Sequence, residues 1–380
     1  MNIFNEIDLI SGKTMNFRLE LEKAEGRKIM GYFCSYVPEE LIHAAGFIPY
    51  RMRAVESAGT KDSSGYFSST NCSYVKHCFD KALNGKFDFL DGLVFMNGCD
   101  HSRRMYDNWL HAGIKPDFMH FLTVPHILSG MAVDHYTGQL NKLKSSIENA
   151  FQVNITPSVL EESVSLYNKK RALLRTISEM RKHDIVPVRG SEFLKIMSAT
   201  TAIPVEDSIT ILQDIIKNLD GRSVSSGNDI RVVFTGCGTE EVEYLELIED
   251  CGASIVADKI CLGSPYYATL VKENTDDPVS ALSERYLTNL SCPRMVDDFR
   301  RRIQSIKQSI ESFHADALIL DKLEFCTYFS GESLLFQKEM KELGVPVIAL
   351  DREFLGGNTG QIKTRVQAFC EKVNNLKAKI

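Results

Sequence analysis

Four short apolar segments of this chain each end a few residues before a cysteine. They are residues 90–96 before Cys99, 230–234 before Cys237, 253–257 before Cys261 and 317–320 before Cys326. Runs of roughly four to eight apolar residues are typical of strands that are buried on both faces, as in a parallel sheet. In open α/β sheets, ligands bind outside the carboxyl ends of the strands. The pattern therefore predicts parallel sheets with a thiolate-bound metal centre at the ends of their strands.

Helical patterns alternate with these strands, which is the signature of βαβ units. The alternation is clear after residue 222 and looser before residue 150. Between them, apolar positions recur only at helical spacing, in one block that begins after Thr156 and in a second block over residues 191–219. We therefore predict an α/β fold of two Rossmann/flavodoxin-like parallel-sheet lobes, residues 1–150 and 223–380, joined by a helical insert over residues 151–222.

Two of the N-terminal cysteines precede predicted helices. Pro38, followed by two glutamates and closed by Gly46, is typical of a short helix that starts just after Cys34. Cys72 opens another helical stretch, which ends near Gly85. The free N–H groups at a helix start favour a thiolate over a thiol. Both positions therefore suit a metal ligand.

The composition excludes several classes of protein. The chain has 44% hydrophobic residues, a net charge of -6 and no run that approaches the roughly 18 apolar residues of a membrane span. Its first residues lack the positively charged segment of a secretory signal. An acidic balance without blocks of Lys and Arg argues against nucleic acid as a partner. We therefore expect a cytoplasmic protein with no membrane contact, whose reduced thiols are available to a metal.

The spacing of the ten cysteines excludes the common short metal motifs. No two of them are closer than six residues, so the paired cysteines of zinc sites and the C-x₂-C runs of ferredoxins are absent. Core packing explains Cys370, Cys251 and Cys78, because free cysteine is among the most buried residue types. Any metal centre must then take its ligands from distant loops of both lobes.

Longer motifs carry a family resemblance. They are residues 31–51 (GYFCSYVPEELIHAAGFIPYR), 99–107 (CDHSRRMYD), 324–326 (EFC) and 360–365 (GQIKTR). These motifs resemble the 2-hydroxyacyl-CoA dehydratase and benzoyl-CoA reductase family over nearly the whole chain. The resemblance implies an oxygen-sensitive iron–sulfur enzyme that receives single electrons from a separate ATP-hydrolysing activator protein. It also implies a homodimer, or a heterodimer with a paralogous subunit, that acts on an acyl-CoA or another small substrate.

The resemblance also implies roles for particular residues. In the dehydratase subunits three cysteines hold one [4Fe-4S] cluster, and they match Cys72, Cys99 and Cys326. Ser35 lies where those subunits carry a serine near the substrate hydroxyl, so it is the candidate catalytic residue. The chain has no G-x₄-G-K-[ST] phosphate loop of its own, which agrees with ATP hydrolysis in a separate protein.

A second set of cysteines departs from the dehydratase pattern. Cys34, Cys261 and Cys292 lie where the double-cubane branch of the family also places cysteines. Three plus three ligands would suit a double-cubane [8Fe-9S] cluster in place of one [4Fe-4S] cluster. The leading hypothesis is therefore the iron–sulfur component of a low-potential reductase. The alternatives are a 2-hydroxyacyl-CoA dehydratase subunit, which is a lyase, and an electron-relay partner subunit.

Overall fold

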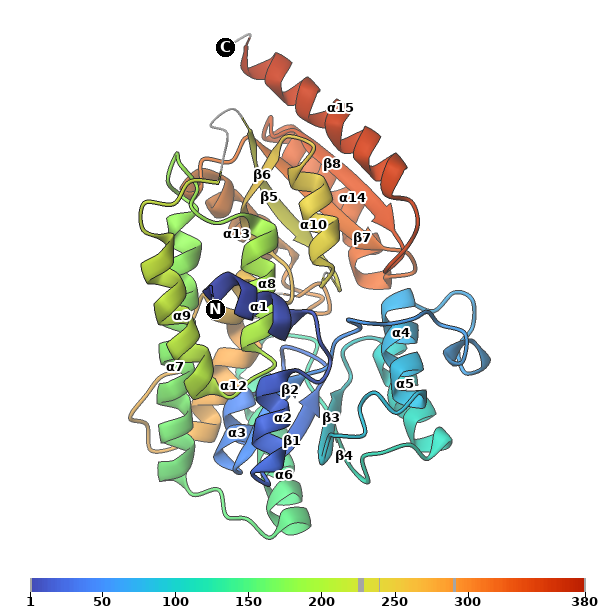
Figure 1. Ribbon diagram of the computed structural model, residues 1–380, viewed down its shortest axis with the longest axis vertical. Coiled ribbons are helices and arrows are strands. Elements are labelled where there is room, and N and C mark those ends of the chain that lie inside the picture. Colours follow the sequence, from blue (N-terminus) through green and yellow to red (C-terminus); the bar gives the residue numbers. More distant parts are fainter. Residues whose placement is uncertain (1, 225–228, 239, 290–291, 379–380) are drawn as a thin grey trace.

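The computed structural model describes residues 2–224, 229–238, 240–289 and 292–378, and it contains two four-stranded parallel sheets (Figure 1). The first sheet has the order β2-β1-β3-β4, with β1 (Lys28–Tyr32), β2 (Phe47–Arg51), β3 (Gly92–Met96) and β4 (Phe118–Leu122). The second has the order β6-β5-β7-β8, with β5 (Ile230–Gly236), β6 (Ala253–Lys259), β7 (Ala317–Leu323) and β8 (Val347–Arg352). The predicted α/β fold with two parallel sheets is thus confirmed.

Helices connect all the strands. Those before residue 152 are α1 (Ile3–Ser11), α2 (Phe17–Ala24), α3 (Glu39–Ala44), α4 (Ser73–Leu83), α5 (Asp100–Ala112) and α6 (Gly130–Phe151), with a short 3₁₀ turn at Ser63–Gly65. The next three are α7 (Pro157–Met180), α8 (Gly190–Thr200) and α9 (Val205–Leu219). The last six are α10 (Val242–Glu249), α11 (Ser264–Tyr267), α12 (Pro278–Asn289), α13 (Phe299–Ser312), α14 (Thr327–Glu342) and α15 (Thr359–Lys377). None of the helices in the described ranges is both long and apolar enough to span a membrane.

Both faces of each sheet are covered by helices, which is why the strands read as continuous apolar runs. On the second sheet, α8, α10 and α15 pack against one face and α13 and α14 against the other. On the first sheet, α3, α6 and α12 cover one face, and α2, α4 and α5 cover the other. Successive residues of a strand, such as Val232 and Val233, accordingly belong to different core clusters.

The middle of the chain is helical, as its apolar spacing predicted. α7 begins as predicted, with the Thr156 side chain capping it and Pro157 in its first turn. The helical block predicted over residues 191–219 consists of two helices, α8 and α9, which separate before Pro204. Proline lacks the N–H that a continuous helix needs and clashes with the preceding turn. Residues 223–228 (SVSSGN) have the polar composition of a linker, and part of this segment lies outside the described residues.

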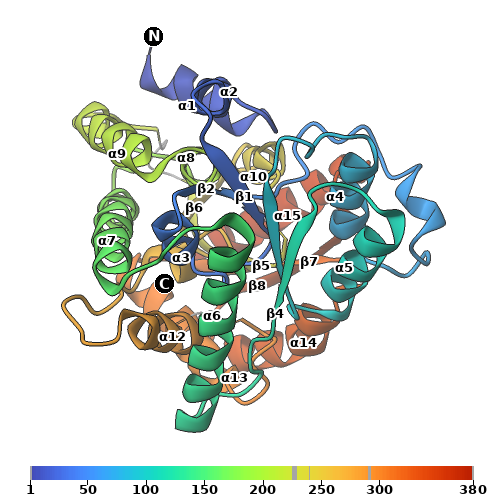
Figure 2. The ribbon, with the colours of Figure 1, turned by 90° about the horizontal axis from the view of Figure 1, so that it is seen from below.

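Segments that are far apart in the sequence pack side by side. Helix α1 lies against α8 and α9, and α12 lies against α6 (Figure 2). A buried ion pair between Glu40 of α3 and Arg171 of α7 also contacts the Tyr286 hydroxyl of α12. The division at residues 150 and 222 stays a prediction.

Candidate functional site

Cysteines lie at or near the carboxyl ends of strands in both sheets, as the apolar runs predicted. Cys34 and Cys99 follow β1 and β3 of the first sheet, and Cys261 and Cys326 follow β6 and β7 of the second. Cys72 and Cys292 reach the same region on longer connections. All the sequence-predicted cysteines therefore come to the region between the two sheets, in two groups.

The first group, which we call the N-cap trio, consists of Cys72, Cys99 and Cys326. Each of them is the N-cap residue of a helix: α4, α5 and α14, respectively. The three thiols influence one another electrostatically, and a single apolar cluster packs around Cys72 and Cys326. His101 accepts a hydrogen bond of 3.2 Å from the Cys72 backbone N–H, which joins the starts of α4 and α5.

Backbone groups at the helix starts act on the sulfurs of the N-cap trio. The Ser102 N–H donates to Cys99 Sγ over 3.4 Å. The first-turn N–H groups of α4 and α14 lower the pKa of Cys72 and Cys326, respectively, although neither of these sulfurs accepts a capping hydrogen bond. Burial nevertheless raises the pKa of Cys72 to about 12 and raises that of Cys99 as well. These sites therefore penalise a bare thiolate, while their donors would stabilise one that is bound to a metal.

Cys237 lies beside the N-cap trio, although it was not among the predicted ligands. Hydrogen bonding to the Cys237 thiol lowers the pKa of Cys326, and the Leu323 N–H donates to Cys237 Sγ over 3.4 Å. Cys237 follows β5, so its position after an apolar run was a signal that could have selected it. Its side chain is buried within the same cluster as Cys72.

The second group, which we call the cavity trio, consists of Cys34, Cys261 and Cys292. These three cysteines line one small cavity of about 50 Å³, together with Ser35. Burial raises the pKa of Cys261 to about 11 and that of Cys292 further still. Cys34 raises the pKa of both Cys261 and Cys292, and Cys261 raises that of Cys292, so the three lie within electrostatic reach of one another.

Ser35 is fixed at the wall of that cavity. Its hydroxyl donates to the Cys261 carbonyl over 3.0 Å and accepts a hydrogen bond of 2.8 Å from Arg51 Nη1. The Arg51 guanidinium faces Glu240 at 3.6 Å and is almost completely buried. The catalytic role of Ser35 is implied by the family resemblance, and these two hydrogen bonds fix the position of its hydroxyl.

Two buried arginines place positive charge near the cavity trio. Arg294, which is 1% exposed, gives its hydrogen bonds to the carbonyls of Pro125 and Val124 and stacks over Tyr36. Its Nε and the Nε of Arg51 have no hydrogen-bond partner among the described residues. Arg51 and Arg294 lower the pKa of Cys261 and Cys292, respectively, against the larger effect of burial. A buried cation without a full set of partners fits an anionic group such as a metal thiolate.

The two trios are neighbours. Tyr328, in the first turn of α14, is half-buried. Cys99 and Cys292, one from each trio, both raise the pKa of its hydroxyl. The next residue, Phe329, lines the cavity of the cavity trio and packs against the cluster that contains Cys326.

The donor set fits a cluster better than a single ion. Among the residues that the structure describes, no three His, Cys, Asp or Glu side chains converge closely enough to bind one metal ion. Soft thiolate donors select iron–sulfur clusters, zinc or copper. Because the irons of a cluster are spread over several ångströms, its cysteines stand farther apart than ligands of one ion. Three thiols at separate helix starts, with backbone donors around them, therefore fit an iron–sulfur cluster.

Other residues singled out in the sequence have structural roles. Cys370 packs among Val366, Phe369 and Val373, as its helical spacing predicted. Cys99 also caps α5, because Ser102 completes a reciprocal pair of hydrogen bonds with it.

Comparisons with known proteins match nearly the whole chain to one family. The family model described as "2-hydroxyglutaryl-CoA dehydratase, D-component" matches residues 34–373. The beta subunit of (R)-phenyllactyl-CoA dehydratase from Clostridium sporogenes is 25% identical over 372 residues, covering 97% of this chain and 98% of that protein. The beta subunit of (R)-2-hydroxyglutaryl-CoA dehydratase from Acidaminococcus fermentans is 24% identical over 96% of each chain. The C subunit of benzoyl-CoA reductase from Thauera aromatica is 23% identical over 93% of this chain and 92% of its own.

Proposed function

Since the chain belongs to the 2-hydroxyglutaryl-CoA dehydratase, D-component family, we propose that it is the iron–sulfur component of an ATP-activated reductase or dehydratase system. The relatives include dehydratase and reductase subunits, which supports an enzyme component of this class. The observation that carries the proposal is the pair of neighbouring cysteine trios between the two sheets.

The N-cap trio would hold one [4Fe-4S] cluster, and the cavity trio would hold a second iron–sulfur unit next to it. The convergence of Cys72, Cys99 and Cys326 at three helix starts supports the first assignment. The Arg294 Nε, which has no hydrogen-bond partner among the described residues, supports an anionic group at the second. Because Tyr328 lies within electrostatic reach of both trios, the two units would be close enough for one double-cubane cluster.

Such a group, when bound, supplies one-electron transfer at low potential. The chain itself provides the surroundings. Cys72 is buried and the other five thiols are partly buried, which limits their contact with water. The Ser102 N–H orients the Cys99 sulfur, and Arg51 fixes the Ser35 hydroxyl at the wall of the cavity. Ser35 would then hold or pass a proton at its Oγ when a substrate carbonyl or hydroxyl lies in that cavity.

Electrons would come from a separate ATP-hydrolysing activator protein. The absence of a G-x₄-G-K-[ST] loop from the sequence supports this separation, since low-potential electrons need an external source of free energy. The relatives are named as single subunits of larger enzymes, and both the C subunit and the B subunit of benzoyl-CoA reductase match this chain, the latter over a part of it. We therefore infer a paralogous partner subunit or a second copy of this chain.

A 2-hydroxyacyl-CoA dehydratase subunit is the second candidate. The dehydratase beta subunits among the relatives favour it, because they match nearly the full length of the chain. The cavity trio favours the reductase, because a dehydratase cluster needs only the N-cap trio. The number of irons in each chain separates the two.

The test is iron and sulfide analysis of the protein purified without oxygen. We expect a brown protein with about eight irons per chain. Cys99→Ala and Cys292→Ala should each lose iron and change the visible spectrum. Cys370→Ala is the matched control, because it removes a buried thiol that lies outside both trios.

Two outcomes would redirect the proposal. About four irons per chain and an unchanged spectrum for Cys292→Ala would favour the dehydratase subunit. A colourless protein with stoichiometric zinc, after expression and purification without oxygen, would refute the iron–sulfur assignment.

A further inference from the structure

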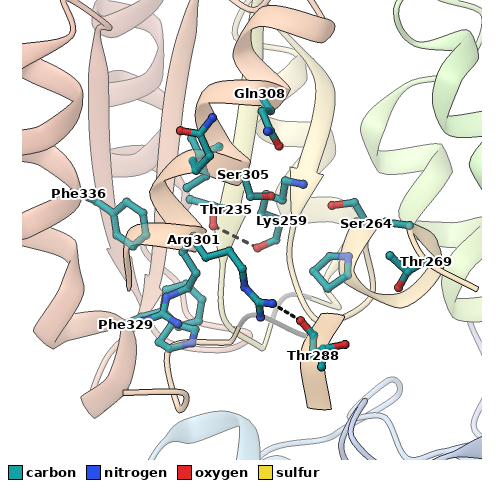
Figure 3. Close-up of a pocket in the computed structure, with 16 residues that line it drawn as sticks. Thr235, Lys259, Ser264, Thr269, Thr288, Arg301, Ser305, Gln308, Phe329 and Phe336 are labelled. Atoms are coloured by element: carbon teal, nitrogen blue, oxygen red, sulfur yellow. Dashed lines mark hydrogen bonds between the residues drawn. The ribbon is translucent and has the colours of Figure 1, made fainter. Parts of the chain in front are cut away.

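A cavity of about 400 Å³ lies next to the cavity trio (Figure 3). Residues from β5, β6, α11, α13 and α14 surround it, and Figure 3 shows Lys259 near its centre with Phe329 and Phe336 along one side. Cavities of roughly 300 to 1,000 Å³ hold small-molecule ligands. Lys259, Phe329, Pro265 and Pro293 line this cavity and also the small cavity of the cavity trio. The two cavities therefore adjoin.

Lys259 is a partly buried cation without a carboxylate of its own. The neighbouring carboxylate, Asp258, interacts with other groups, because its Oδ2 lies 2.7 Å from Arg181 and its Oδ1 accepts the Ser264 N–H. No carboxylate of the described residues forms an ion pair with Lys259. An ammonium group that lines a cavity and has no ion-pair partner is stabilised by an anion in that cavity.

The other cations of the wall are already neutralised. Arg301 pairs with Asp298 at 2.6 Å and donates to the Thr288 carbonyl. Arg302 pairs with Glu332. Lys259 is then the source of net positive charge, which matches a ligand with one anionic group rather than a polyphosphate.

The remaining lining divides into polar and apolar parts. Ser305 and Gln308 of α13 face the cavity with a hydroxyl and an amide, and the buried Thr269 hydroxyl has no hydrogen-bond partner among the described residues. Phe329 and Phe336 of α14 form an aromatic wall. A ligand that satisfies both parts carries one anionic group and an apolar or aromatic body.

We propose that this cavity binds a small organic anion, with the anionic group at Lys259 and the apolar body against Phe329 and Phe336. This inference goes beyond the proposed function, because it stands whether or not the cysteines bind iron. It adds a ligand site beside the cavity trio, from which a bound molecule would border Cys261 and Cys292.

The experiment compares benzoate with benzamide, two probes of nearly equal shape that differ in charge. Binding to the full-length protein, purified without oxygen, is measured by calorimetry. We expect benzoate to bind at least about tenfold more tightly than benzamide, because charge-assisted hydrogen bonds are worth that much or more. Lys259→Met and Lys259→Gln should abolish this preference. Lys338→Met, which removes an exposed lysine from α14, should keep it.

The other outcomes overturn the proposal. Equal affinities for the two probes would show that no cation selects the ligand. A preference that survives in Lys259→Gln would exclude Lys259 as that cation. Inorganic phosphate that displaces benzoate at equal concentration would exclude the apolar half of the site. The iron content of the lysine variants should match the wild type, so failure here leaves the cysteine assignments untouched.

Discussion

The Ser35 hydroxyl is held between two partners, since it accepts a hydrogen bond of 2.8 Å from Arg51 and donates one of 3.0 Å to the Cys261 carbonyl. Ser35 and Arg51 are both buried, with 8% and 4% of their surface exposed. The pair joins the first sheet to the loop after β6 of the second sheet. Loss of either partner therefore affects the region between the two sheets.

Ser35→Ala should destabilise the protein by about 1–3 kcal/mol, because it leaves a buried guanidinium donor without its acceptor. The measurement is urea unfolding of the variant and the wild type under identical conditions without oxygen. Ser69→Ala, in an exposed loop, is the control and should change the free energy of unfolding by less than about 0.5 kcal/mol. An unfolding midpoint equal to that of the wild type would show that the Arg51 contact does not hold in solution.

Cys237→Ala should shift the reduction potential of the proposed cluster to more negative values. Hydrogen bonds to the cluster sulfurs raise the potential, and Cys237 is hydrogen-bonded to Cys326. A hydrogen bond of about 1 kcal/mol corresponds to roughly 40 mV for one electron. Redox titration followed by visible absorption measures the shift. Cys237→Ser retains a donor and should shift the potential less, whereas equal potentials in all three proteins would argue against the contact.

Sequence reasoning predicted the parts of the fold that depend on local periodicity. The apolar runs that became β3, β5, β6 and β7 are recognisable because both of their faces are buried, and the start of α7 is recognisable from the cap at Thr156. The break between α8 and α9 was missed, although Pro204 marks it. There the helical pattern continues on both sides of the proline.

The grouping of the cysteines could not come from local pattern. Cys99 and Cys326 each follow the carboxyl end of a strand, but the two strands belong to different sheets. Which of these loops meet depends on how the two sheets pack together, and the local sequence does not show that. The family resemblance supplied the two trios. Neither approach selected Cys237 as a group beside the trio, although its position after the apolar run 230–234 set it apart from Cys251, which follows a helix. The local pattern places Cys237 at a strand end but does not show that this end lies beside Cys326.

Arg171→Met should destabilise the protein strongly, because it leaves Glu40 as an uncompensated buried charge. Burial raises the pKa of Glu40, but Arg171 and Arg285 hold it below its ordinary value. Removing one partner of such a pair costs about 3–5 kcal/mol. Urea unfolding at pH 7 measures the loss. Glu40→Gln combined with Arg171→Met should recover part of it, and a double variant that is less stable than the sum of both single changes would contradict the pairing.

Acid should weaken the same ion pair. The folded pKa of Glu40 is lower than its unfolded value, so the carboxylate contributes stability that is present above the unfolded pKa of about 4.5. This contribution is lost as the pH falls through the folded pKa. As the pH falls below about 5, the free energy of unfolding should therefore decrease more in the wild type than in the double variant Glu40→Gln/Arg171→Met. Urea unfolding at a series of pH values measures this difference.

Lys81 should contribute stability to the protein as the pH rises from about 8 to about 10.5. Burial lowers the pKa of Lys81 to about 8 from its ordinary 10.5, while its ammonium group donates to Thr14 Oγ1 and the Arg53 carbonyl. Between those values the unfolded chain binds the Lys81 proton and the folded chain does not, so this residue adds about 3 kcal/mol to the free energy of unfolding. Below pH 8 the cost of the buried charge is present in full. Buried thiols such as Cys72 and Cys261 act in the opposite direction, because their pKa values are raised, but they do so equally in a Lys81 variant. In urea unfolding at intervals from pH 7 to 10.5, the wild type and the surface control Lys338→Met should therefore gain stability relative to Lys81→Met, and a constant difference across this range would refute the assignment to Lys81.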